Sequence, residues 1–241
     1  MNIYFIVVIV LVVLYFFLLA CNVYLQKART AQIGSTCGFY ALNNALSELG
    51  YPKKTQAEML DIIKKCHERG LTIVGEIFDH TTCETIIKDY FPEVYNHMTV
   101  IKRIDSYNEL KNKLRNNDSF VFIPVGAITT LHYILIRTNN GNMQSMDPGR
   151  CKWVRLNQRK FKKYISRRKK HDHEEFNWKK YFRKQAGISS IIFRSCGKLM
   201  AGHELSENYN YSEKMHKDAR NKTLSTSVNS GDVIYLIKRE A

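Results

Sequence analysis

Cys37 and Gln32 lie in a segment whose residue types could carry out acyl chemistry. Residues 32–46 read QIGSTCGFYALNNAL, and the apolar side chains after Cys37 recur at helical spacing. Cys37 is therefore expected at a helix N-terminus, where unpaired N–H groups and partial positive charge favour a thiolate over a thiol. The Gln32 amide and the Cys37 N–H could then hold the oxyanion that forms when a thiolate attacks a carbonyl. This chemistry also requires a general base and a group that orients it.

A downstream hairpin is predicted to supply both groups. Residues 131–136 (LHYILI) are typical of a strand and place His132 near its start, while Asp147 precedes a Pro-Gly pair. An Asn-Gly pair between them, at 140–141, indicates a tight turn. His132 would take the proton of Cys37, and Asp147 would accept the other imidazole N–H. A register shift of one residue would turn Asp147 away from the histidine.

The combined pattern resembles the papain-like cysteine peptidases, especially their C39-like bacteriocin-processing branch, which has Gln before Cys-Gly, then His-Tyr and Asp-Pro. The nucleophile segment, with Leu-Asn-Asn at 42–44, is also similar to the josephin deubiquitinases. The resemblance covers about residues 30–150 and implies roles for Gln32 (oxyanion), Cys37 (nucleophile), His132 (base) and Asp147 (orientation). The Gln–Cys gap is shorter than in the C39-like branch, and josephins orient the histidine with Asn. The superfamily is therefore better supported than either branch.

The order of predicted elements indicates an α+β fold, with helices followed by an antiparallel sheet. It fits a papain-like architecture in which the nucleophile helix packs on the sheet that carries the base. Helices are predicted at 37–49, 55–67, 84–90 and 106–115, with Thr82 and Ser106 as caps, and at 161–184 with a break at 171–173. Strands are predicted at 98–101, 118–125, within the hairpin 132–147, at 188–193 and at 232–237. Residues 196–230 are predicted to form an irregular polar excursion.

An apolar run at residues 3–20 is close to the lower length limit for a bilayer-spanning helix. A secretory signal is the alternative, but no Lys or Arg precedes the run and no small-residue cleavage site follows it. Lys27 and Arg29 follow the run, so a single-pass anchor would leave the downstream domain in the cytoplasm. The predicted division is an anchor at 1–21, a tether at 22–31, a catalytic domain at 32–195 and a final segment at 196–241.

A basic segment accounts for most of the net charge of +15. Residues 150–184 contain 15 Lys or Arg against three Asp or Glu, a local excess of 12 positive charges. Anionic lipid headgroups are the simplest expected partner beside a membrane anchor. The alternative is a solvated helix face that keeps the protein soluble. No nucleic-acid-binding motif accompanies the charge, so nucleic acid is not an expected partner.

The six cysteines are scattered and show no disulfide framework. A rival reading would place zinc between Cys66, His67, His80 and Cys83. Cys66 and His67 are adjacent on a predicted helix and point in different directions, which disfavours joint ligation. No metal or organic cofactor is expected.

The sequence thus predicts a membrane-anchored thiol peptidase that hydrolyses a peptide or isopeptide bond without a cofactor. One alternative is an acyltransferase or transglutaminase-like enzyme, because the same Cys-His-Asp group can pass an acyl group to an amine. The other is an inactive, membrane-bound binding protein that retains the peptidase fold.

Overall fold

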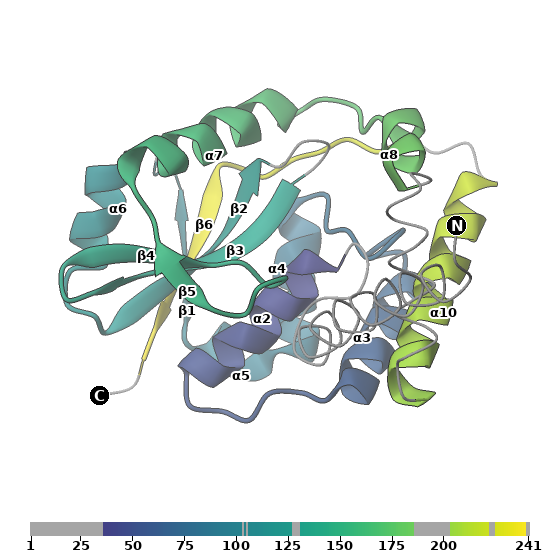
Figure 1. Ribbon diagram of the computed structural model, residues 1–241, viewed down its shortest axis with the longest axis horizontal. Coiled ribbons are helices and arrows are strands. Elements are labelled where there is room, and N and C mark those ends of the chain that lie inside the picture. Colours follow the sequence, from purple (N-terminus) through teal and green to yellow (C-terminus); the bar gives the residue numbers. More distant parts are fainter. Residues whose placement is uncertain are drawn as a thin grey trace, which may run out of the picture.

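A six-stranded antiparallel sheet organises the part of the chain that the structure describes. The computed structural model describes residues 36–102, 104, 106–126, 131–185, 203–221 and 225–239. The strands run in the order β1-β6-β2-β3-β4-β5 (Figure 1). Their bounds are β1 Met98–Lys102, β2 Ser119–Gly126, β3 Leu131–Asn139, β4 Asn142–Met146, β5 Trp153–Arg155 and β6 Val233–Lys238. The last strand therefore returns to the sheet and lies between β1 and β2.

Strand β2 lies inside the sheet and is covered on both faces. All eight of its residues are buried, and it pairs with β3 on one side and β6 on the other. Phe120 and Phe122 pack on one face, whereas Val121, Ile123 and Val125 pack on the other. Because neither face meets water, the strand needs no polar alternation, which explains its apolar sequence. The strand predicted at 118–125 is confirmed.

Helices cover the two faces of this sheet in separate layers (Figure 1). Helices α2 to α5 pack in one apolar cluster with Phe122 and Tyr133, and α6 and α7 pack in a second cluster with Ile123 and Ile134. Helix α10 packs against α3. The helices are α2 Cys37–Glu48, α3 Gln56–Glu68, α4 His80–Tyr90, α5 Pro92–Asn96, α6 Tyr107–Lys113, α7 Gln158–His171, α8 Trp178–Gln185 and α10 His203–Arg220. The α+β class with an antiparallel sheet is confirmed.

The predicted hairpin forms between β3 and β4 with a two-residue turn. Asn140 and Gly141 have φ values of 47° and 72°, the left-handed conformation that this turn requires at both positions. Leu135 pairs with Met146. If the same register continues, Asp147 lies beside Ile134. Ile134 is two residues from His132 on β3, so the two side chains point to the same face of the sheet. The turn therefore sets the register that brings Asp147 near the histidine.

Several helix boundaries follow from local hydrogen bonds. Thr55 and Glu58 form a capping box at the start of α3, whereas Ser106 occupies the N-cap of α6 without a side-chain capping hydrogen bond. Helix α4 begins at His80, and its cap is Asp79, whose carboxylate accepts a hydrogen bond from the Thr82 N–H at 2.8 Å. The prediction that Thr82 caps a helix starting at 84 is wrong, because the aspartate three residues upstream takes that N–H.

The prediction of an irregular polar segment is wrong for residues 203–220, which form α10. Met215 and Ala219 are buried and lie four residues apart, as a packed helix requires. Asn208 and His216 are also buried. Because these buried residues are polar, the hydrophobic pattern of the sequence did not indicate a helix here.

Some predicted features lie outside the described residues: the apolar run 3–20, the tether 22–31, Gln32 and the strand at 188–193. Among the described residues, the structure contains no helix with the length and apolar character needed to span a membrane.

Candidate active site

Cys37 is the first residue of α2, as the sequence predicts. Thr36 occupies the N-cap position but makes no side-chain capping hydrogen bond to the helix, and the first turn contains no acidic residue. The positive end of the helix dipole therefore lies at the thiol without a carboxylate that would offset it. Cys37 is only 4% exposed, so a substrate must displace neighbouring side chains to reach the sulfur.

His132 lies near both predicted partners. Its Nε2 lies 2.9 Å from Asp147 Oδ2, and the imidazole lies near enough to Cys37 for that side chain to raise the pKa of the histidine. Because Nε2 is engaged by the carboxylate, Nδ1 is the nitrogen available to Cys37. The other oxygen of Asp147 accepts a hydrogen bond from the Gly149 N–H at 2.9 Å, which fixes the carboxylate. The structure thus places His132 beside Asp147 and near Cys37.

The charges of this group stabilise a protonated imidazole. Burial alone would lower the pKa of His132, but the charge and hydrogen bonding of Cys37 and Asp147 outweigh it and raise the pKa to about 11. Burial would raise the pKa of Asp147, yet the hydrogen bond and positive charge of His132 hold it below its usual value. Both shifts favour a protonated imidazole beside an ionised Asp147.

Gln32, the predicted oxyanion donor, lies outside the described residues, so its role stays a prediction.

A cavity of about 200 Å³ reaches Asp147 and is lined in part by Lys160 and Tyr164 of α7. A larger polar cavity of about 480 Å³ is lined by His80, Lys169 and their neighbours and by none of the predicted site residues. The predicted chemistry therefore lies away from the larger of these two cavities.

The two asparagines after Cys37 on α2 hold the loops around the site. The Asn43 amide bonds the backbone of Lys54, with its oxygen 2.8 Å from the Lys54 nitrogen. Asn44 lies 3.9 Å from the sulfur of Cys151, and that thiol donates to the Pro148 carbonyl at 3.0 Å. Asn44 thereby connects α2 to the turn that carries Asp147. Sequence reasoning used this pair only for family resemblance and missed its structural role.

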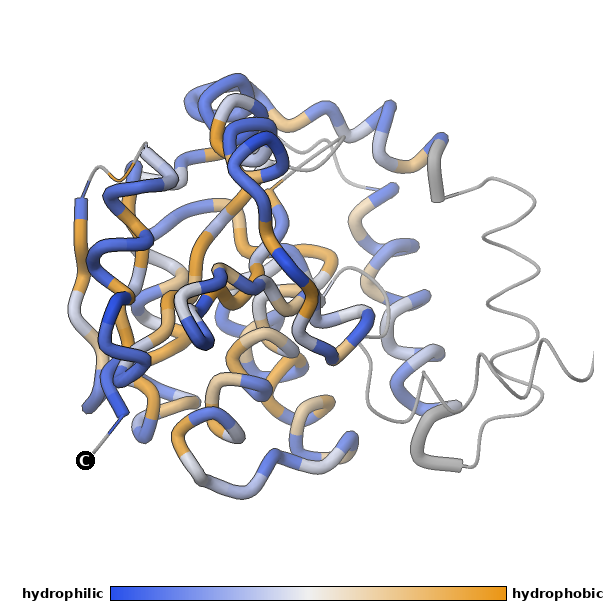
Figure 2. The backbone as a smooth tube through the Cα atoms, turned by 60° about the vertical axis from the view of Figure 1, so that its left-hand side comes forward, coloured by the Kyte–Doolittle hydropathy of each residue, from blue (hydrophilic) through white to orange (hydrophobic). Residues whose placement is uncertain are grey.

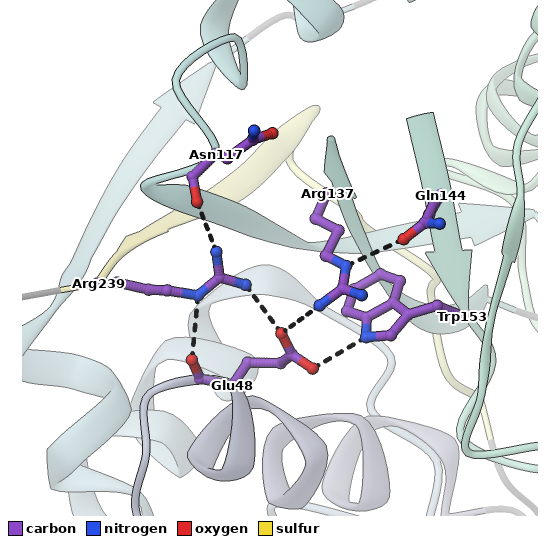
Figure 3. Close-up of polar contacts among 6 residues, drawn as sticks. All are labelled: Glu48, Asn117, Arg137, Gln144, Trp153 and Arg239. Carbon is purple, nitrogen blue, oxygen red and sulfur yellow. Dashed lines mark hydrogen bonds and ion pairs between the residues drawn. The ribbon is translucent and has the colours of Figure 1, made fainter. Parts of the chain in front are cut away.

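Glu48, at the last turn of α2, forms a second polar cluster that sequence reasoning missed (Figure 3). Its carboxylate accepts hydrogen bonds from Arg137 at 3.0 Å, Arg239 at 2.8 Å and the Trp153 indole at 2.9 Å. The Arg137 guanidinium also lies 4.1 Å from the centre of the Trp153 ring. These contacts join the end of α2 to β3, β5 and the segment after β6. Glu48 and Arg137 are 89 residues apart in the chain, so no local sequence pattern indicates that they are in contact.

The other described cysteines lie in different environments from Cys37. Cys66 and Cys83 are fully buried, and burial raises the pKa of each thiol to about 12. Burial also raises the pKa of Cys151. The rival zinc site is not supported, because no three His, Cys, Asp or Glu side chains within the described ranges are placed to share a metal ion. His67 instead lies 3.0 Å from the Tyr211 hydroxyl through Nδ1.

Comparison with known families gives one result that bears on this site. Residues 27–127 match the family model of the actin maturation protease-like C-terminal domain. The match covers 101 of the 241 residues and includes Gln32 and Cys37, but it ends before His132. The nucleophile half of the site is therefore similar to a protease-like family. Neither the curated proteins nor the solved structures gave a significant match.

Proposed function

We propose that the protein is a cysteine peptidase of papain-like fold, with Cys37 as nucleophile, His132 as general acid and base, and Asp147 as the residue that orients the imidazole. The observation that carries the proposal is the position of His132, whose Nε2 lies 2.9 Å from Asp147 Oδ2 and whose pKa is raised by the nearby Cys37. The match of residues 27–127 to a protease-like family supports it independently of that geometry.

The proposed reaction proceeds in two stages. The Cys37 thiolate adds to the carbonyl carbon of a peptide bond, and the resulting oxyanion accepts hydrogen bonds from the Cys37 N–H and the Gln32 amide. The His132 imidazolium gives its proton to the leaving amine as the C–N bond breaks, which leaves a thioester on Cys37. His132 then removes a proton from water, the water oxygen attacks the thioester, and a carboxylic acid leaves as the thiol re-forms.

The proposal includes a membrane anchor and a branch of the superfamily. The apolar run at 3–20 would hold the enzyme in the bilayer, and Lys27 and Arg29 would keep the catalytic domain on the cytoplasmic side. The Gln, Cys-Gly, His-Tyr and Asp-Pro pattern resembles the C39-like peptidases. The support for both statements comes from the sequence.

The test is cleavage by the full-length protein in detergent micelles or nanodiscs. A proteome-derived peptide mixture is incubated with the protein, and new N-termini are identified by mass spectrometry. We expect a defined set of new N-termini that is absent with Cys37→Ala at equal concentration. Products that form only when a primary amine is added would favour the acyltransferase instead. No products with any acceptor would favour an inactive binding protein and would overturn the proposal.

A further inference from the structure

Helix α7 separates its buried side from its charged side. Phe161 and Ile165 face the sheet and are buried. Arg159, Lys163 and Lys170 are exposed and lie at spacings of four and seven residues, which places them on the opposite side of the helix. The helix carries eight Lys or Arg and no acidic residue. Its outer side is therefore a stripe of positive charge.

Helix α8 continues this stripe. In two views that differ by 60°, α7 and α8 follow the same edge of the molecule, and hydrophilic residues dominate there (Figures 1 and 2). We call seven exposed cations of the two helices the basic face and leave out exposed Lys169, which lines the larger cavity: Arg159, Lys162, Lys163, Lys170, Lys179, Lys180 and Arg183. Within the described ranges, none of these seven side chains forms an ion pair. The positive charge of the basic face is therefore available to a partner.

Solubility alone does not explain this clustering. Like charges three or four residues apart on a helix repel one another and destabilise it. A surface on which positive and negative charges are interspersed keeps a protein soluble with less repulsion between like charges. A concentrated positive field instead attracts an extended anionic surface.

The aromatic residues of α8 do not favour nucleic acid as that surface. Trp178 packs on Phe176 with ring centres 4.7 Å apart and stacks on Phe182 at 5.6 Å. Phe176 and Tyr181 are buried. Because these rings pack on one another, they form no platform on which bases could stack.

We propose that the basic face docks on a bilayer that contains anionic lipids. A lipid surface presents its phosphates in a plane, which the outer sides of two helices can contact together. A nucleic acid, which follows a groove, fits such a surface less well. The apolar run at 3–20 provides an independent reason for a bilayer to be close. Helix α2 packs on the opposite face of the sheet from α7, so docking through the outer side of α7 does not cover α2. The proposal does not depend on peptidase activity.

The experiment measures lysine acylation on the full chain in nanodiscs. Discs of neutral phosphatidylcholine are compared with discs that contain one third phosphatidylglycerol, and acylation at each lysine is followed by mass spectrometry. Each lysine close to an anionic surface raises the partition of the protein onto that surface by about fivefold. We therefore expect acylation of Lys162, Lys163 and Lys170 to slow by about fivefold or more in anionic discs. Exposed Lys65 and Lys88, on α3 and α4, serve as internal controls and should be unchanged. Salt at about 1 M should remove the protection, since it screens charges beyond about 3 Å.

A pair of variants separates docking from net charge. Lys162→Glu with Lys163→Glu should abolish the protection of Lys170, whereas Lys65→Glu with Lys88→Glu changes the net charge equally and should preserve it. Equal acylation of the basic face in neutral and anionic discs would overturn the proposal. Protection by a DNA duplex added to neutral discs, without protection by anionic lipid, would also overturn it and would identify nucleic acid as the partner.

Discussion

Glu48 on α2 forms an ion pair with Arg137 on β3, with Oε2 and Nη1 3.0 Å apart. The same two elements carry Cys37 and His132. Glu48 lies at the end of α2 opposite Cys37, and Arg137 lies five residues after His132 on β3. The pair therefore helps to fix how α2 lies along β3, on which the approach of the sulfur to the imidazole depends.

Glu48→Ala is expected to lower the free energy of unfolding by about 2 kcal/mol, because two partly buried arginines and an indole N–H lose their acceptor. Urea unfolding followed by circular dichroism measures the change. Asp61→Ala is the matched control, since Asp61 pairs with Lys65 through side chains that are 58% and 56% exposed. It should cost less than about 0.5 kcal/mol. Equal losses in the two variants would contradict a structural role for the Glu48 cluster.

The pKa of His132 should depend on the sulfur. In the wild type the imidazole is expected to stay protonated through neutral pH, because its pKa is raised to about 11. Cys37→Ala removes the largest favourable charge, so burial should bring the pKa down toward the usual value of about 6.5, while Asp147 still opposes that fall. NMR titration of the ring nitrogens between pH 5 and 10 should show a midpoint for the variant and none for the wild type. A wild-type histidine that titrates near pH 6.5 would contradict the thiolate–imidazolium pair.

Asp147 should orient the imidazole by its oxygen as well as by its charge. Asp147→Asn keeps an acceptor for the Nε2–H, so the alkylation rate of Cys37 should fall by only a few fold. Asp147→Ala removes charge and acceptor together and should reduce that rate by about tenfold or more. Timed reaction with iodoacetamide gives both rate constants. If Asn and Ala slow the reaction equally, hydrogen bonding to Asp147 does not position His132.

The strand patterns and the hairpin were predictable because they depend on local sequence. Asn140-Gly141 fixed the turn, the turn fixed the register, and the register brought Asp147 close to His132. The capping box at Thr55 was also local. By contrast, the pairing of β6 between β1 and β2 joins segments more than 100 residues apart, and no local signal specifies it.

The parts that sequence reasoning missed depend on contacts between distant residues. Glu48 is stabilised by arginines 89 and 191 residues away, and a lone glutamate near a helix end gives no sign of that environment. Helix α10 escaped prediction because buried Asn208 and His216 interrupt its apolar pattern. His216 lies 2.8 Å from the Tyr181 hydroxyl, and such a partner becomes visible only in the fold.

Gly126 should tolerate no side chain, because β2 and α7 approach closely there. A Cβ at this position would lie 2.1 Å from the backbone carbon of Arg167. Gly126→Ala should therefore cost about 2 kcal/mol of unfolding free energy, since a helix backbone cannot yield locally. Gly38→Ala is the contrasting variant: its Cβ would meet the flexible end of Ile77, and alanine favours the helix, so we expect a change below about 1 kcal/mol. Thermal unfolding measures the stability of both variants. If Gly38→Ala is destabilised and Gly126→Ala is not, β2 and α7 do not pack as closely as described.

The most direct test of the account is the site of alkylation on the intact protein at neutral pH. Iodoacetamide is applied in limiting amount, and each cysteine is quantified by peptide mass spectrometry. We predict that Cys37 reacts at least tenfold faster than Cys66 and Cys83, whose buried thiols have a raised pKa, and that His132→Ala slows Cys37 by about tenfold or more. Reaction of Cys37 at the same rate with and without His132 would contradict the claim that the imidazole activates this sulfur.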